Sequence, residues 1–273
     1  MPELPEVETT RRGVAPHLEG RCVTGVVVRE RRFRQPVPEN LADILLGQRL
    51  TQVSRRAKYL LFKFTQGTLI VHLGMSGSLR ITTPGSPPKP HDHIDLEFDD
   101  QVCLRLRDPR RFGLMLWTPE DPLQHRLLAG LGPEPWDQRF SAEYLAQLAS
   151  ARSVAVKSFL MDGAIVVGVG NIYASESLHR AGIHPSRPAR RIALPRYAAL
   201  VVAVREVLEL AIGFGGTTLR DFTHNDGQPG YFRNELQVYG RAGQPCLRCG
   251  TAAPIAQRVI GQRASYFCPR CQR

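Results

Sequence analysis

Alternation of apolar and charged residues in the first half of the chain predicts β-strands. Residues 94–98 and 102–107 each alternate in this way, and a short Asp99-Asp100 turn joins them. A period of two is typical of a strand with one buried face. The two segments therefore predict a hairpin whose charged face is in contact with water.

Further apolar runs extend this pattern. They lie at residues 22–28, 59–64 and 68–73. Together with the hairpin they predict an antiparallel sandwich or barrel. The stretch 74–90 is rich in Gly, Ser and Pro and is expected to be partly mobile loop.

Helical periodicity occurs at the N-terminus and again in the second half. Val7, Val14 and Leu18 fall on one side of a helix that precedes the β region. The clearest helix is expected from Pro195 to Gly213, where apolar residues recur with a period of 3.6.

A proline-rich stretch at residues 118–136 separates the two patterns and indicates a domain boundary. We expect three parts: a β-rich domain at 1–133, a helical domain at 134–236, and a small basic module at 237–273 that contains four of the six cysteines.

The charge of the chain favours a polyanionic partner. Thirty-six Lys and Arg against twenty-five Asp and Glu give a net charge of +11. No apolar run approaches the ~18 to 20 residues that a membrane span needs, and no secretory signal precedes the first helix. We therefore expect a cytosolic protein without a membrane partner.

Four cysteines form two pairs with metal-ligand spacing. The pairs are Cys246 with Cys249 and Cys268 with Cys271, and eighteen residues separate them. Such pairs supply four thiolates to one tetrahedral Zn²⁺, and the intervening length suits a β-hairpin. Because no coordination position remains for substrate, this zinc is expected to be structural. The alternative is a set of unrelated buried thiols, which is what we expect of Cys22 and Cys103.

The N-terminal residues carry a second candidate chemistry. Proline and glutamate at a terminus usually indicate a frayed end. If Met1 is removed, however, Pro2 offers a secondary amine that is partly neutral near pH 7. Its reaction with a sugar aldehyde gives an iminium cation that draws electrons and promotes elimination of phosphate. The neighbouring Glu3 can transfer protons.

Eight segments in order along the chain resemble formamidopyrimidine-DNA glycosylase. They are residues 2–8 (PELPEVE), 56–61 (RAKYLL), 72–76 (HLGMS), 108–113 (DPRRFG), 169–176 (VGNIYASE), 226–232 (DGQPGYF), 238–243 (VYGRAG), and the C-terminal QRAS with its cysteines. The related endonuclease VIII subfamily carries Gly where this chain has Leu4. The cysteine pairs are slightly farther apart here than is usual in the family, with the surplus expected at 252–254.

The resemblance implies catalytic roles at matching positions. Pro2 would be the Schiff-base nucleophile, Glu3 the acid and base at the deoxyribose, and Glu6 a supporting carboxylate. Lys58 would donate a proton during β-elimination, although it could be an ordinary exposed lysine. Arg263 would assist δ-elimination.

The resemblance also implies DNA contacts. Residues expected to bind phosphate are His91, Arg110, Arg152, Lys157 and Asn171, although His91 and Arg152 could be merely solvated.

Residues expected to fill the space left by a flipped base are Met75, Arg110 and Phe112. By periodicity alone, Met75 and Phe112 would be core residues.

The fold implied is α+β and multidomain: an N-terminal antiparallel β-sandwich with flanking helices, a C-terminal helix-two-turns-helix domain, and a four-cysteine zinc-finger β-hairpin. Residues 163–171 would form the turns, and 217–229 a loop over the flipped base. The glycines of 163–171 lack the spacing of a nucleotide-binding loop, so no nucleotide or organic cofactor is expected.

The function implied is base-excision repair, in which a monomer acts on double-stranded DNA. It would remove oxidised purines such as 8-oxoguanine and formamidopyrimidines, then cleave the abasic site by β,δ-elimination. Two alternatives remain: an endonuclease VIII-like glycosylase for oxidised pyrimidines, and a non-catalytic zinc-containing nucleic-acid-binding protein.

Overall fold

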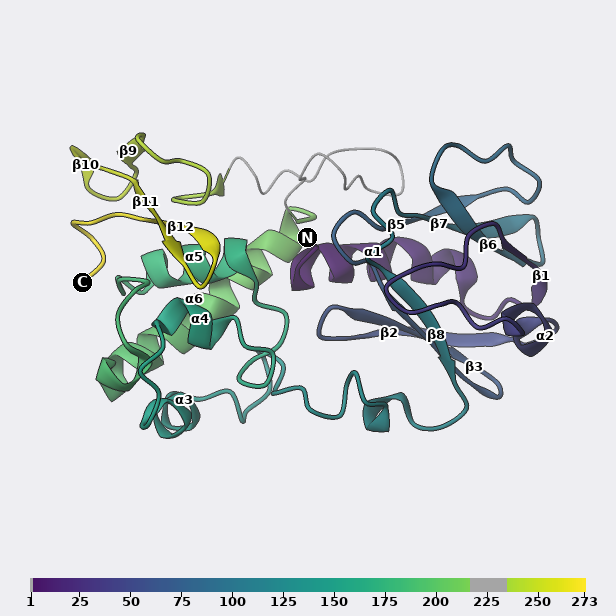
Figure 1. Cartoon of the computed structure of the whole chain (residues 1–273), viewed down its shortest axis with the longest axis horizontal. Coiled ribbons are helices and arrows are strands. Elements are labelled where there is room, and N and C mark those ends of the chain that lie inside the picture. Colours follow the sequence, from purple (N-terminus) through teal and green to yellow (C-terminus); the bar gives the residue numbers. More distant parts are fainter. Residues whose placement is uncertain (1, 217–234) are drawn as a thin grey trace. The chain divides into compact units, whose positions relative to one another are not determined.

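The computed structural model describes residues 2–216 and 235–273, which fall into two compact units (Figure 1). The first unit contains residues 2–129 and 214–216, and the second contains residues 130–213 and 235–273. The expected loop at 217–229 lies outside the described residues. The three-part division at 133 and 236 stays a prediction.

The first unit is built from two four-stranded antiparallel sheets (Figure 1). One sheet has the order β1 (Val23–Val28), β6 (Asp92–Phe98), β7 (Val102–Arg107) and β5 (Ser78–Thr82). The other has the order β2 (Leu50–Arg56), β3 (Tyr59–Phe64), β4 (Gly67–His72) and β8 (Leu114–Thr118). Three helical segments accompany the sheets: α1 (Leu4–Leu18), α2 (Leu41–Leu45) and the 3₁₀ turn η1 (Pro122–Gln124).

Both sheets and α1 contribute to one hydrophobic core. Val14 and Leu18 of α1 share a cluster with Phe62 and Val71 from one sheet and Leu104 from the other. Full burial of such a side chain contributes roughly 1.5–3 kcal/mol. The sandwich, the hairpin of β6 and β7, and the N-terminal helix predicted from periodicity are confirmed.

The stretch 74–90 is loop apart from the strand β5, which pairs with β7 along its length, and its expected mobility stays a prediction. Two expectations for this unit were wrong. The charged face of the hairpin is largely covered, because Asp95 and Arg105 are 1 % and 2 % exposed and Glu97 and Arg107 are half-buried. Cys22 is only half-buried because it lies just before β1, whereas Cys103 is buried as predicted.

The second unit is helical and includes the cysteine-bearing strands. Its helices are α3 (Ala142–Ala149), α4 (Val156–Leu160), α5 (Asn171–Arg180), the 3₁₀ turn η2 (Ala189–Arg191) and α6 (Leu194–Gly213). Its strands are β9 (Pro245–Cys246), β10 (Gly250–Pro254), β11 (Ala256–Ile260) and β12 (Arg263–Phe267).

The long helix predicted from Pro195 to Gly213 is confirmed as α6, whose Leu200, Val204 and Leu208 are fully buried. The predicted hairpin between the cysteine pairs is confirmed as β11 and β12. A register shift between β9 and β10 falls where the surplus residues were expected. Across the described ranges, no helix is both long and apolar enough to cross a membrane.

Candidate active site and nucleic-acid interface

The start of α1 brings together the three N-terminal candidate residues. The backbone N–H of Glu3 donates to Oε2 of Glu6 at 2.8 Å, and the Glu3 side chain accepts from the Glu6 backbone in return. Both carboxylates are nearly inaccessible, at 3 % and 2 % exposure, and Pro2 beside them is buried. This reciprocal capping places two carboxylates at the positively polarised end of a helix, next to Pro2.

Lys58 occupies the tight turn between β2 and β3 in the same unit. The turn consists of Ala57 and Lys58, with Ala57 in the left-handed region at φ 56°. Arg55 supports the turn by donating to the carbonyl of Ala57 at 2.8 Å. Burial, followed by the charges of Lys58 and Arg34, lowers the pKa of His72 to about 4. The Lys58 ammonium therefore acts electrostatically on the end of β4.

The buried carboxylate of Asp108 joins the two loops that carry the predicted void-filling residues. It accepts from the Ser76 hydroxyl at 2.7 Å and from the backbone N–H of Gly113 at 2.9 Å. The loops also touch through their backbones, because a Cβ added to Gly74 would lie 2.4 Å from the nitrogen of Gly113. Gly74 also has φ 62°, so both its left-handed backbone conformation and the close approach of Gly113 require glycine there.

These two loops expose apolar side chains. Met75 is 37 % and Phe112 47 % exposed, and the Arg110 guanidinium lies 4.7 Å from the centroid of the Phe112 ring. The core placement that periodicity favoured for Met75 and Phe112 is therefore wrong. The structure brings Arg110 and Phe112 into contact and ties the Met75 loop to theirs.

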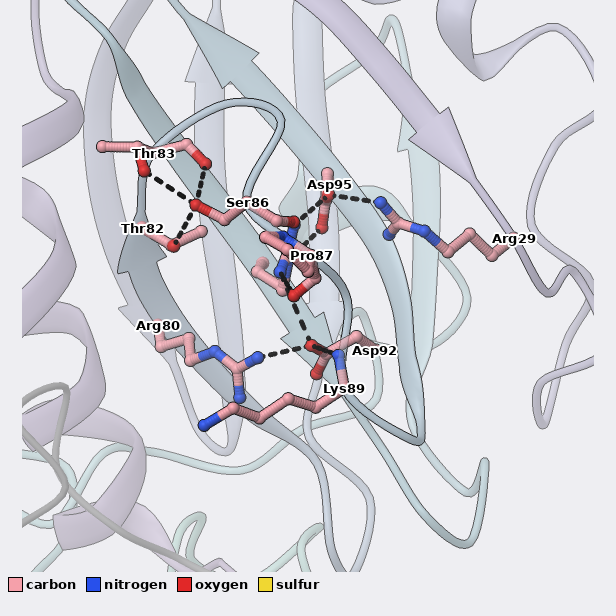
Figure 2. A network of polar contacts seen from close by, with 10 residues as sticks. Arg29, Arg80, Thr82, Thr83, Ser86, Pro87, Lys89, Asp92 and Asp95 are labelled. Atoms are coloured by element: carbon pink, nitrogen blue, oxygen red, sulfur yellow. Dashed lines mark hydrogen bonds and ion pairs between the residues drawn. The ribbon is translucent and has the colours of Figure 1, made fainter.

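A buried ion network holds the segment that leads to His91 (Figure 2). Arg105 donates to both oxygens of Asp95 at 2.7 Å and to the carbonyl of Ser86 at 2.9 Å. This segment covers the hairpin face that periodicity assigned to solvent. Arg29 also pairs with Asp95, at 2.7 Å. In Figure 2 it approaches the carboxylate from the side away from Ser86 and Pro87.

Asp92 forms the second half of the network. Its carboxylate accepts from the backbone N–H of Lys89 at 2.8 Å and from the guanidinium of Arg80 (Figure 2). Pro90, which follows Lys89, leads directly to His91, which is exposed and has φ 73°. The network thus fixes Lys89 and Asp92 on either side of His91. The phosphate contact of His91 stays a prediction.

Lys157 has a more internal position than a phosphate contact requires. It is 1 % exposed, and its Nζ donates to Oδ1 of Asn171 at 2.6 Å, to Oγ of Ser265 at 2.6 Å and to the carbonyl of Ala264 at 3.1 Å. Asn171, the first residue of α5, also donates to the Ala264 carbonyl at 3.1 Å. The ammonium therefore joins α4, α5 and β12, and its role in DNA binding stays a prediction.

Arg263 lies at the tip of the β11–β12 hairpin and is exposed. The tip rests on α4, because a Cβ added to Gly261 would lie 2.7 Å from Oγ of Ser158. Arg152, in the loop before α4, pairs with Asp162 at 3.4 Å and is partly exposed. The second unit therefore presents Arg263 and Arg152 at its surface, with Asn171 held between α4 and β12.

Periodicity and motif spacing missed Glu176 of α5. This residue is 3 % exposed and accepts the backbone N–H groups of Gln237, Val238 and Tyr239 at 2.9, 3.0 and 2.8 Å. Burial raises the pKa of Glu176, while the three N–H groups oppose that rise. The carboxylate fixes the chain segment that enters the cysteine module, a contact across some sixty residues of sequence that no local pattern indicates.

The four predicted metal ligands converge in space. Their sulfur atoms all lie within 4.8 Å of one another, with Cys246 to Cys271 at 3.9 Å and Cys249 to Cys268 at 3.6 Å. Tetrahedral Zn–S bonds of about 2.3 Å require S···S separations of about 3.8 Å, so the cluster fits zinc. Burial raises the pKa of Cys246, but backbone N–H groups of Cys249 and Arg248 and neighbouring thiols lower it to about 7. One structural zinc with four cysteine ligands is confirmed as the cofactor.

Three domain models match the chain, and two of them belong to one enzyme family. They are the formamidopyrimidine-DNA glycosylase N-terminal domain at residues 1–115, the H2TH domain of the same enzyme at 131–223, and the zinc finger found in FPG and IleRS at 243–273.

Whole-chain relatives agree. The formamidopyrimidine-DNA glycosylases of Methylococcus capsulatus and Pseudomonas putida are 60 % and 59 % identical to the chain, each covering 100 % of both sequences. The MutM (Fpg) crystal structure from Thermus thermophilus is 38 % identical, covers 99 % of this chain and 98 % of its own, and has a TM-score of 0.88. A Lactococcus lactis FPG mutant in complex with Fapy-dG-containing DNA is 33 % identical, covers 100 % of both chains, and has a TM-score of 0.92.

A β-sandwich, a helix-two-turns-helix domain and a four-cysteine zinc finger together define a DNA-repair glycosylase. The chain belongs to the formamidopyrimidine-DNA glycosylase family, as its motifs indicated.

Proposed function

We propose that this chain removes oxidised purines, such as 8-oxoguanine and ring-opened formamidopyrimidines, from double-stranded DNA and then cleaves the strand by β,δ-elimination. The observation that carries the proposal is the capped start of α1, where Pro2 adjoins the buried carboxylates of Glu3 and Glu6. Relatives crystallised with DNA containing Fapy-dG or an abasic site support the same substrate class.

The chemistry begins at the amine of Pro2, once Met1 has been removed. The nitrogen bonds to C1′ of the damaged nucleotide and the base departs, with Glu3 transferring protons at the sugar. Cleavage of the C1′–O4′ bond, with a proton delivered to O4′, opens the sugar ring and leaves an iminium ion at C1′. The iminium acidifies the C2′ hydrogen. Removal of that proton breaks the C3′–O bond, and a second elimination breaks the C5′–O bond. Water then releases the sugar fragment and restores the amine.

The remaining predicted residues support this reaction. Lys58 is proposed to donate a proton during β-elimination, and Arg263 to assist δ-elimination and bind phosphate. His91, Arg110, Arg152, Lys157 and Asn171 are proposed to contact or position the DNA backbone. Met75, Arg110 and Phe112 are proposed to occupy the space of the flipped nucleotide, since unstacking costs a few kcal/mol unless it is filled. The exposure of Met75 and Phe112 supports that role.

The zinc ion is proposed to supply structure and not chemistry. Four cysteine ligands leave no position for water or substrate, so zinc bound there would fold the strands that bear Arg263. A monomer in the bacterial cytosol, acting at the nucleoid, is the setting that the proposal implies.

Borohydride trapping tests the proposal. Reduction of the protein with a duplex that contains one 8-oxoguanine should produce a covalent complex. A form with an uncleaved residue before Pro2, which blocks the amine, should bind the duplex but give no adduct. Pro2→Gly should likewise fail to accumulate the covalent adduct. Pro16→Ala, late in α1, should form the adduct as the wild type does.

Two other outcomes would favour a different function, and a third would contradict the mechanism. Binding without an adduct in the wild type would indicate a non-catalytic DNA-binding protein. Trapping that is restricted to oxidised pyrimidines would indicate an endonuclease VIII-like activity. Trapping that survives blockage of the amine would contradict the role of Pro2.

A further inference from the structure

The end of α5 makes two contacts with the cysteine pair Cys246 and Cys249. His179, in the last turn of α5, is 3 % exposed, and its Nε2 lies 3.7 Å from Sγ of Cys246, which is 1 % exposed. Arg248, between the two cysteines, donates to the backbone carbonyls of His179 and Arg180, each at 3.4 Å. Arg248 thus supplies a donor to the Arg180 carbonyl at the helix end and a second donor to the His179 carbonyl, which already accepts from the backbone N–H of Gly182.

The direction of the His179–Cys246 hydrogen bond follows from zinc chemistry. A zinc-bound cysteine is a thiolate and has no proton to donate, so the imidazole N–H must be the donor. Within residues 2–216 and 235–273, the Cys246 sulfur is the hydrogen-bond partner of the His179 ring. A donor to a buried thiolate offsets part of the cost of burying its charge and fixes the orientation of the ligand.

We propose that His179 is a zinc-site residue that donates from Nε2 to the Cys246 thiolate and couples metal binding to the position of α5. The opposite end of that helix is Asn171, which lies in the Lys157 hydrogen-bond cluster with β12. The zinc module therefore contacts both ends of α5: its metal-binding segment at the C-terminal end and its hairpin at the N-terminal end. Zinc loss should loosen the helix at the end where His179 lies.

A pair of substitutions separates the hydrogen bond from packing. His179→Met keeps an apolar side chain of similar length without a donor, whereas His179→Gln keeps an N–H. In competition with a chromogenic chelator, His179→Met should lose about 10–100-fold in zinc affinity, and His179→Gln should stay close to wild type. His184→Met is the matched control: its ring packs on Phe267 at 4.5 Å and makes no hydrogen bond to a cysteine sulfur in the described ranges.

The same experiment can overturn the proposal. Equal losses in His179→Met and His179→Gln would assign His179 a packing role, and no loss in His179→Met would remove it from the site. If the variants do not fold, a measurement on the unmutated protein still tests the hydrogen bond. With ¹¹³Cd in place of zinc, nuclear magnetic resonance should detect scalar coupling between the metal and the Nε2 proton of His179. Absence of that coupling in folded, cadmium-loaded protein would refute the hydrogen bond.

Discussion

The hydroxyl of Ser76 donates to the buried carboxylate of Asp108 at 2.7 Å, and this pair joins two loops that are more than thirty residues apart in the sequence. Asp108 also accepts from the backbone N–H of Gly113, and it is fully inaccessible. A single carboxylate thus organises the part of the first unit that carries Met75 and Phe112.

Loss of that carboxylate should destabilise the first unit. Asp108→Ala leaves the Ser76 hydroxyl and the Gly113 N–H buried without an acceptor, which should lower the free energy of unfolding by about 1–3 kcal/mol. Urea denaturation would measure the change. Asp100→Ala is the control, because that carboxylate is 79 % exposed and pairs only with Arg21 among the described residues. Equal effects of the two substitutions would show that Asp108 does not organise the loops.

Phe112 should matter for excision and not for folding. Because its ring is 47 % exposed, Phe112→Ala should change the free energy of unfolding by less than about 0.5 kcal/mol. Single-turnover excision of 8-oxoguanine should nevertheless slow, since the space left by the flipped base would be unfilled. Leu123→Ala, at 46 % exposure in the same unit, is the control. A loss of stability without a slower excision rate would make Phe112 a packing residue.

The sequence predicted the regular elements well because their signals are local. Strand alternation at 94–98, the helix at Pro195 to Gly213 and the two cysteine pairs each depend on neighbours a few residues apart. Alternation also placed Asp95 and Arg105 correctly on the face away from the core. It could not show that another segment covers that face.

The missing information is long-range. The acceptors of Lys157 in β12 are more than a hundred residues away in the sequence, and Glu176 binds backbone N–H groups some sixty residues away. Almost every residue type has a backbone N–H, so the sequence does not identify which residues donate. No motif therefore predicts a carboxylate that accepts from backbone N–H groups. The exposure of Met75 and Phe112 likewise depends on how two loops meet.

Salt dependence can decide what Lys157 does. If Lys157→Met removes a direct phosphate contact, the slope of log affinity against log salt should become shallower by about one. If the ammonium positions Asn171 and β12, as its hydrogen bonds to Asn171, Ala264 and Ser265 indicate, affinity should fall while the slope is unchanged. The control is Lys63→Met, an exposed lysine of β3. Fluorescence anisotropy across a salt series on a lesion-containing duplex gives both quantities.

Arg105→Met should be among the most destabilising single substitutions in the first unit. It would leave Asp95 as a buried carboxylate with one fewer partner, and loss of one member of a buried ion pair costs about 3–5 kcal/mol. Thermal unfolding should report a lower midpoint. Arg107→Met, two positions along the same strand and half-buried, should have a smaller effect. Comparable midpoints for the two variants would show that the network in Figure 2 does not stabilise the unit.

His72 should make stability depend on pH below neutrality. Burial, with the charges of Lys58 and Arg34, lowers its pKa from 6.5 to about 4, and the backbone N–H of Gly74 donates to Nδ1 at 2.9 Å. As pH falls below about 6.5, His72 takes up a proton in the unfolded chain but stays neutral in the folded protein. The stabilisation is therefore complete above pH 6.5 and is lost between pH 6.5 and 4, to a total of about 3 kcal/mol.

Urea unfolding at pH 7.5, 6 and 5 would measure this loss, with His72→Gln expected to flatten the pH dependence over that range. His17→Gln is the matched control, because His17 is exposed in the last turn of α1. It should keep the wild-type slope. The remaining buried histidines contribute equally to wild type and variant, so the difference between the two curves isolates His72. A His72→Gln curve parallel to that of the wild type would mean that this imidazole takes up its proton equally well in the folded and unfolded states.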